Sequence, residues 1–153
     1  MKTVKLTELG IDNLSIVESE LPEIKPNEVL VNIKAVSLNY LDLILADGSF
    51  GADLPMPYTP ASDGAGVVEA AGDEVTEWSI GDRVLIHYMP KWQSGNLDEE
   101  ANSVRVGLQT QGVLSEYVTF PEYGLVKAPD NLTLDEGATL PIAAITAWEG
   151  LIN

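Results

Sequence analysis

The chain has 153 residues, 45% of them apolar, and contains no cysteine. A length of this order suits one domain that buries most of its apolar surface. Without cysteine the chain has no disulfide, no catalytic thiolate and no zinc site built on thiolates. The 24 acidic residues outnumber the eight basic ones and give a net charge of −16. Such a charge repels phosphate backbones and anionic lipid head groups, so we expect neither nucleic-acid binding nor a role at a membrane surface.

Neither a targeting segment nor a membrane span is indicated. The N-terminal stretch MKTVKLTELG lacks the apolar centre of a signal peptide. No apolar run in the chain approaches the roughly 20 residues needed to cross a bilayer. We therefore expect a soluble cytoplasmic protein.

The first two-thirds of the chain has the pattern of short β-strands separated by turns. Alternation of apolar and polar residues is clearest over residues 28–37, where Val29, Val31 and Ile33 share one face. Further strands are predicted over residues 2–8, 14–21, 66–72, 82–89, 113–120 and 123–129. This arrangement favours a mainly β fold, a partly open barrel. Its predicted core is Leu6, Val17, Val29, Val31, Ile33, Val67, Val84, Ile86, Val118 and Val126.

Helical signals are few and come mostly late in the chain. Residues 39–48 fit a short helix ended by Gly48, and Thr133 is the expected N-cap of a helix that begins at Leu134. Apolar residues spaced three and four apart predict a helix over residues 138–153. Residues 90–112 show no sustained period, and so long a loop is usually functional or inserted.

The segment DGAGVVEA contains a Gly64-x-Gly66 pair that resembles part of a dinucleotide fingerprint. The third position of that fingerprint falls on Glu69, where glycine or alanine is needed for close helix–strand packing. A β-branched run follows where a helix should begin. We therefore interpret the glycines as a tight entry into a strand, not as a nucleotide site.

Five segments in order, SLNYLDL, PYTPASDGAGVVEAAGDEV, IGDRV, GVLSEYVTFP and ATLPIAAITAW, carry a resemblance to a known family. They resemble the N-terminal, GroES-like half of medium-chain dehydrogenases/reductases, in particular the zinc-independent quinone-oxidoreductase and alcohol-dehydrogenase-like branch. The resemblance covers almost the whole chain. It implies a GroES-like barrel over residues 1–130 and a helical crossover segment over residues 131–153 that leads into a Rossmann domain.

In that family the Rossmann domain holds most of NAD(P)H and usually forms the homodimer. We therefore expect residues 1–153 to be one half of a longer enzyme, inactive alone and monomeric without its cofactor domain. The stripe formed by Trp148, Leu151 and Ile152 should then lie exposed, frayed or packed on a neighbouring molecule, because its partner is absent.

The resemblance also allows the metal positions of zinc-dependent members to be compared. The first ligand position matches Asn39, the histidine and glutamate positions match Ser62 and Asp63, and the last falls near Ile142. These side chains do not make a zinc site. Residues 90–112 stand where other members carry a four-cysteine zinc lobe, so we expect no zinc.

Without a metal, hydrogen bonds must polarise the substrate. The resemblance places Asn39 beside the nicotinamide, as a catalytic and cofactor-binding residue, although this asparagine can also simply cap the following helix. Tyr40 is a candidate proton donor, with a buried aromatic anchor as the plainer alternative. Thr146 matches a threonine that approaches the nicotinamide, or it bonds back to its own helix. Asp42 is expected to hold the loop through backbone hydrogen bonds, with catalysis as the alternative. His87 is expected to be a structural histidine, with a proton relay as the alternative.

Two classes of function remain open. The first is the catalytic domain of a zinc-independent, NAD(P)H-dependent oxidoreductase that acts on a quinone, an activated alkene or an aldehyde/alcohol. The second is a stand-alone GroES-like binding or scaffold module without catalysis. Trp78 and Trp92 are expected to pack, with an entrance role for Trp92 as the alternative.

Overall fold

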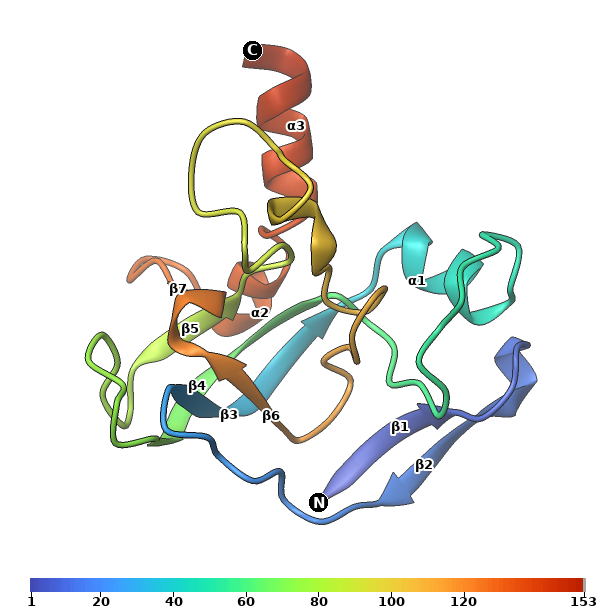
Figure 1. Cartoon of the computed structure of the whole chain (residues 1–153), viewed down its shortest axis with the longest axis horizontal. Helices are drawn as coiled ribbons and strands as arrows, with labels where there is room; N and C mark the ends of the chain where they lie inside the picture. The colour runs from blue at the N-terminus through green and yellow to red at the C-terminus, as the bar shows by residue number, and fades with distance from the viewer. Residues whose placement is uncertain (153) are drawn as a thin grey trace.

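Five antiparallel strands form the main sheet of the computed structural model, which describes residues 1–152 (Figure 1). Their order is β6–β3–β4–β5–β7, and β1 and β2 form a separate two-stranded sheet. The strands are β1 (Lys2–Leu6), β2 (Leu14–Glu18), β3 (Glu28–Ser37), β4 (Asp63–Ala71), β5 (Arg83–Ile86), β6 (Tyr117–Pro121) and β7 (Leu125–Lys127). The helices are α1 (Tyr40–Ala46), α2 (Leu134–Ala138) and α3 (Ala143–Ile152), with 3₁₀ turns η1 (Ile11–Asn13), η2 (Ala101–Ser103) and η3 (Glu122–Gly124).

The main sheet is curled, which confirms the predicted mainly β, partly open barrel. The ladder between β3 and β4 shifts register at Leu30/Val31 and again at Ile33/Ala35. Such bulges bend a strand and increase its twist. The two-stranded sheet joins this body through isolated bridges from Thr3 to Ser115 and from Leu6 to Tyr58. Among the described residues, none of the helices has the length and hydropathy to cross a membrane.

The core follows the predicted strand faces in part. Leu6, Val29, Val31, Val84 and Ile86 are buried, as predicted. The prediction is wrong at one position, because Val126 is 45% exposed. β7 is a three-residue edge strand, and its middle side chain lines a surface groove instead of the core.

Four further core predictions are only half-buried: Val17, Ile33, Val67 and Val118. On β4 the buried valine is Val68, which packs against Val31 and Val84 in the main core cluster. The bulges of β3 displace the register of its partner strand, and alternation alone does not reveal this shift.

The two glycines of the DGAGVVEA segment lie inside β4, so the segment is no nucleotide-binding turn. A Cβ atom on Gly66 would lie 2.4 Å from the carbonyl oxygen of Asn32 and 2.7 Å from Cγ1 of Val31. Glycine is therefore required by the close approach of β3, and not by a turn as predicted.

The second of the two predicted C-terminal helices begins later than predicted, because α2 ends at Ala138 and α3 begins at Ala143 and not at residue 138. The hydroxyl of Thr133 accepts a hydrogen bond from the N–H of Glu136, which confirms the predicted cap of α2. The break between the helices contains Pro141, which has no N–H to continue a helix. Asn153 lies outside the described residues.

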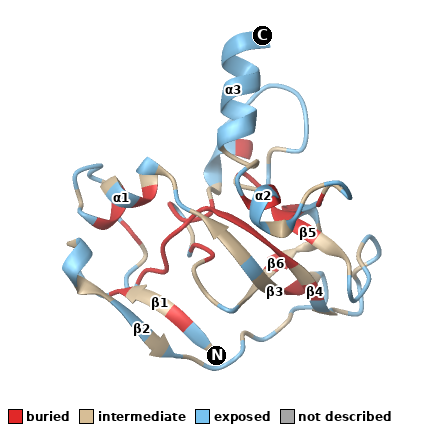
Figure 2. Ribbon diagram, turned by 180° about the vertical axis from the view of Figure 1, so that it is seen from behind, coloured by how far each residue is buried: buried red, intermediate tan, exposed pale blue. Residues whose placement is uncertain are grey.

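Helix α2 packs on the sheet, whereas α3 projects away from it beside the long loop (Figure 1). Ala138 of α2 is buried with Ala65 and Leu85. The predicted exposure of the α3 stripe is confirmed: Trp148 is 62% exposed, Leu151 83% and Ile152 64% (Figure 2).

Candidate functional site

A buried carboxylate at the start of β4 joins three segments that are far apart in the sequence. Asp63 is fully buried, and its Oδ2 accepts a hydrogen bond of 3.0 Å from Nδ2 of Asn39. The same oxygen lies 3.4 Å from the backbone nitrogen of Ile142, which donates to it. Asn39 is the N-cap residue of α1, and Ile142 directly precedes α3. The structure thus brings Asn39, Asp63 and Ile142 together.

A second buried carboxylate lies beside the first. Asp42 of α1 is 6% exposed, and its Oδ2 accepts from the backbone N–H of Asn39 at 2.7 Å. Its Oδ1 lies 3.5 Å from the hydroxyl of Ser62, the residue before Asp63. Asp42 therefore fixes the turn that presents Asn39, which is the loop-holding role expected for it.

Burial governs the electrostatics of this carboxylate pair. It raises the pKa of Asp63 to about 6, against the lowering effect of the Asn39 and Ile142 hydrogen bonds, and the charge of Asp42 raises that pKa further. Burial also raises the pKa of Asp42. Oδ1 of Asp63 has no hydrogen-bond partner within residues 1–152. Burial therefore disfavours the charged form of both carboxyls, and the N–H and O–H groups around them offset only part of this effect.

Sequence reasoning missed two residues near this pair, Tyr88 and Arg105. Burial raises the pKa of the Tyr88 phenol, the Arg105 guanidinium opposes this, and the carboxylates of Asp42 and Asp63 reinforce it. The carbonyl of Tyr88 accepts from the N–H of Val106, which fastens the long loop to the end of β5. Tyr88 belongs to the strand predicted over residues 82–89, whereas the position of Arg105 depends on the path of residues 90–112, for which no local sequence signal exists.

An apolar groove of about 620 Å³ runs between the end of β5, β7 and α3. Tyr88, Ile142 and Thr146 are among the residues that line it. Because the N–H of Ile142 bonds to Asp63, the groove borders the carboxylate site. His87 also lines the groove, and its Nδ1 accepts from the N–H of Met89 at 3.0 Å, as expected of a structural histidine.

The other predicted site residues lie as follows. Tyr40 is 76% exposed, so the interpretation of it as a buried anchor is wrong: the first turn of α1 turns its side chain to solvent. Thr146 is exposed on α3, and its N–H donates to the carbonyl of Ile142 at 2.9 Å. Trp92 lines the groove, and Trp78 packs on the main core with its Nε1 donating to the carbonyl of Glu122.

Comparison with known proteins identifies the family of the domain. Residues 25–130 match the family described as the alcohol dehydrogenase GroES-like domain. The chain belongs to this family. It is the N-terminal, GroES-like domain of the medium-chain dehydrogenase/reductase superfamily.

Relatives of this GroES-like domain are considerably longer than the chain. A zinc-type alcohol dehydrogenase-like protein of Schizosaccharomyces pombe is 41% identical over 94% of the chain, which covers 42% of that protein. The 2-methylene-furan-3-one reductase of Solanum lycopersicum is 36% identical over 99% of the chain and 37% of its own length. A crystal structure from Sinorhizobium meliloti 1021, provisionally assigned as an alcohol dehydrogenase, superposes with a TM-score of 0.90 at 37% identity. The match covers 99% of the chain and 45% of the chain in that crystal structure.

The residues of this GroES-like domain do not fit a zinc ion. The matched positions hold an amide, a hydroxyl, one carboxylate and an isoleucine, whereas zinc prefers thiolate, imidazole and carboxylate ligands. Oδ2 of Asp63 already accepts two N–H groups, which leaves only the other oxygen of this carboxylate, Oδ1, for a metal. Within residues 1–152, no three His, Cys, Asp or Glu side chains gather as a metal site.

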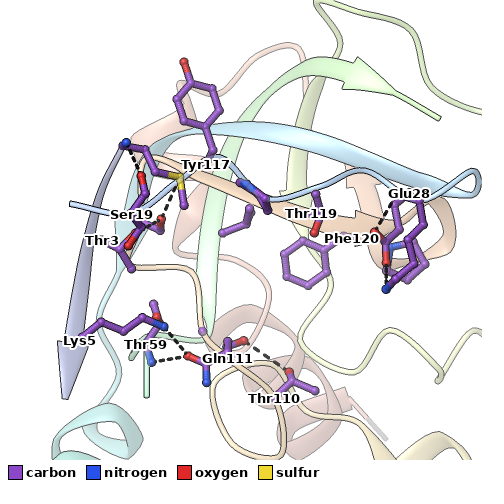
Figure 3. Close-up of a pocket in the computed structure, with 17 residues that line it drawn as sticks. Thr3, Lys5, Ser19, Glu28, Thr59, Thr110, Gln111, Tyr117, Thr119 and Phe120 are labelled. Carbon is purple, nitrogen blue, oxygen red and sulfur yellow. Dashed lines mark hydrogen bonds and ion pairs between the residues drawn. The ribbon is translucent and has the colours of Figure 1, made fainter. Parts of the chain in front are cut away.

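A second hollow, of about 520 Å³, lies near the N-terminus, and hydrogen bonds along its wall connect separate segments of the chain (Figure 3). Gln111 lines one side of it: its Oε1 accepts from Nζ of Lys5 at 3.0 Å and from the N–H of Thr59 at 2.7 Å. Its Nε2 donates to the carbonyls of Pro55 and Pro57. These bonds occupy the amide and tie β1 to the 55–59 segment.

Proposed function

We propose that this GroES-like domain is the catalytic domain of an NAD(P)H-dependent oxidoreductase that works without zinc. The observation that carries the proposal is the amide of Asn39, held 3.0 Å from a buried carboxylate at the position where the family's zinc enzymes bind their metal. An amide fixed in this way offers a preorganised dipole in place of a Lewis acid.

The amide nitrogen of Asn39 carries two hydrogens, and Asp63 accepts only one of them. The second is free to bind a substrate carbonyl or the cofactor carboxamide. Asn39 is half-buried, so a ligand can reach it while water is partly excluded. When bound, the nicotinamide supplies or accepts the hydride.

Proton transfer and cofactor contact are assigned to two exposed residues. Tyr40 follows Asn39 directly, and its exposed phenol is the proposed proton donor to the reduced substrate. Thr146 presents its hydroxyl at the groove beside α3 and is the proposed contact to the nicotinamide. The apolar lining of that groove suits a flat, weakly polar ring system.

The rest of the cofactor needs another domain. A pyrophosphate is usually held by a Gly-rich turn at a helix N-terminus, and Gly64 and Gly66 lie within a strand instead. We infer that a Rossmann domain binds the remainder of NAD(P)H, docks on the exposed stripe of α3 and forms a homodimer. The substrate class is a quinone, an activated alkene or an aldehyde/alcohol, and the name of the tomato reductase favours the second. A cytoplasmic location is part of the same proposal.

The test joins residues 1–153 to the cofactor domain of the Sinorhizobium relative and measures NADH and NADPH oxidation against all three substrate classes. We expect turnover, and Asn39→Ala should lower kcat at least about tenfold, since one hydrogen bond to developing charge is worth this much or more. Asn131→Ala, at an exposed asparagine far along the chain, is the matched control. Equal rates for Asn39→Ala and the parent would contradict the role of Asn39.

The reading frame beyond Asn153 distinguishes the proposed enzyme from the alternative, a stand-alone binding module. A strand followed by a Gly-rich turn within the next few dozen codons supports the enzyme. A stop codon directly after Asn153 supports the module.

A further inference from the structure

One buried carboxylate connects the two residues that the proposed function assigns to the nicotinamide. Oδ2 of Asp63 accepts from the side-chain amide of Asn39 at 3.0 Å and from the N–H of Ile142 at 3.4 Å. The carbonyl of Ile142 accepts from the N–H of Thr146 at 2.9 Å. Asn39 and Thr146, which are more than 100 residues apart, are thus linked through Asp63 and one helical turn.

Asp63 is well suited to hold this arrangement because its own backbone is fixed. It is the first residue of β4 and pairs with Ser37, the last residue of β3. Asn39 follows Ser37 by two residues, so the amide lies just beyond the end of the ladder that fixes the carboxylate. Asp63 is fully buried, and water does not compete for its oxygens.

We propose that Asp63 is a positioning residue, whose carboxylate fixes the amide of Asn39 and the start of α3, and through it Thr146, relative to each other. This inference rests on the proposed function for its catalytic meaning. The hydrogen-bonded link itself is independent of any activity. Asp63 has no access to substrate and acts through Asn39.

The surroundings of Asp63 provide a readout that a merely structural residue would not give. The groups facing it are the Asp42 carboxylate from α1, the Tyr88 phenol after β5 and, beyond that phenol, the Arg105 guanidinium. When Asp63 takes up a proton, the hydrogen bond from Asn39 loses its charge and weakens. The side-chain amide of Asn39 should therefore report the protonation of Asp63.

The experiment is NMR spectroscopy of the 153-residue chain between pH 4 and pH 8. We expect the side-chain amide protons of Asn39 to titrate with a midpoint near the value of about 6 given for Asp63. In Asp63→Ala the amide hydrogens of Ile142 and Thr146 should exchange about tenfold faster or more, because a hydrogen bond to a charged group is lost. Asp63→Asn keeps an acceptor oxygen. In this variant the amide hydrogens of Ile142 and Thr146 should still exchange slowly, but the side-chain amide of Asn39 should no longer titrate. Asp53→Ala, at an exposed aspartate, is the control.

An Asn39 amide that does not titrate, or unchanged exchange at Ile142 in Asp63→Ala, would overturn the proposal. If Asp63→Ala does not fold, the proposal is tested by the titration of the Asn39 amide in the parent chain and by the loss of that titration in Asp63→Asn. In the joined protein, Asp63→Ala should lower kcat at least about tenfold with a smaller change in KM. Failure of the parent joined protein to transfer hydride would sink the proposed function and leave the link between Asn39, Asp63 and α3 standing.

Discussion

The charge of Asp63 should make the stability of this domain fall as the pH rises. Burial raises its pKa in the folded protein to about 6, from an ordinary value of 3.8. The folded state therefore favours the protonated carboxyl. Its contribution to stability is fully present below pH 3.8 and is lost as the pH rises through about 6.

The size of the effect follows from the same difference. About two pKa units correspond to about 3 kcal/mol, and most of this, about 2–3 kcal/mol, falls between pH 4 and pH 7.5. A domain of this size is stable by about 5–15 kcal/mol, so the loss is measurable. The chain contains 23 other acidic residues, so a variant that lacks only this charge is needed as reference.

Asp63→Asn provides that reference, because asparagine stays neutral and keeps an oxygen that can accept from Asn39. Urea unfolding followed by tryptophan fluorescence gives the free energy of unfolding of both proteins at each pH. We expect the parent value minus the Asp63→Asn value to decrease by about 2–3 kcal/mol from pH 4 to pH 7.5. Asp42 is present in both proteins, so its own titration largely cancels. Asp53→Asn, at an exposed loop position, is the control. A difference that stays flat or increases with pH would refute the reasoning.

Four further outcomes are expected. Tyr58→Phe should destabilise the domain by about 1–3 kcal/mol in urea unfolding, because the carbonyl of Gly107 loses its buried 2.6 Å partner; an unchanged midpoint would contradict this. Calorimetry of the chain alone should detect no micromolar binding of NADH or NADPH, since no Gly-rich turn at a helix N-terminus is present within residues 1–152; a micromolar Kd would disprove it. Chelator-treated chain that is then exposed to zinc and dialysed should retain far less than one zinc per chain by elemental analysis, and stoichiometric zinc would speak against the site described. Leu151→Ser should change the stability of the chain alone by less than about 0.5 kcal/mol, because the side chain is exposed, yet weaken the joined protein; equal effects on both would argue against docking on α3.

Features set by local chemistry could be predicted from the sequence. The alternation in residues 28–37 predicts β3 with its observed bounds, and Thr133 marks the start of α2 through its own hydroxyl. Pro141 in the sequence indicates the break before α3, because proline cannot continue a helix. The regular apolar spacing on both sides of Pro141 nevertheless predicts one uninterrupted helix.

Features set by long-range geometry could not be predicted. The exposure of Val126 depends on β7 being an edge strand, and the burial of Val68 depends on bulges in a partner strand. The family resemblance pointed to Asn39, Asp63 and Ile142 as metal positions, but only the structure shows that Oδ2 of Asp63 accepts hydrogen bonds from both Asn39 and Ile142. Tyr88 follows β5 directly, whereas Arg105 approaches it through the path of an irregular loop, which no periodicity encodes.

The central claim, hydride transfer without zinc by a domain that uses Asn39 held by Asp63, is tested most directly by one measurement. The protein that joins residues 1–153 to a cofactor domain is treated exhaustively with a chelator, shown to be metal-free by elemental analysis, and assayed for NADH and NADPH oxidation. The account predicts that turnover survives the treatment and that added zinc does not raise it. Turnover that disappears on chelation and returns with stoichiometric zinc would contradict it.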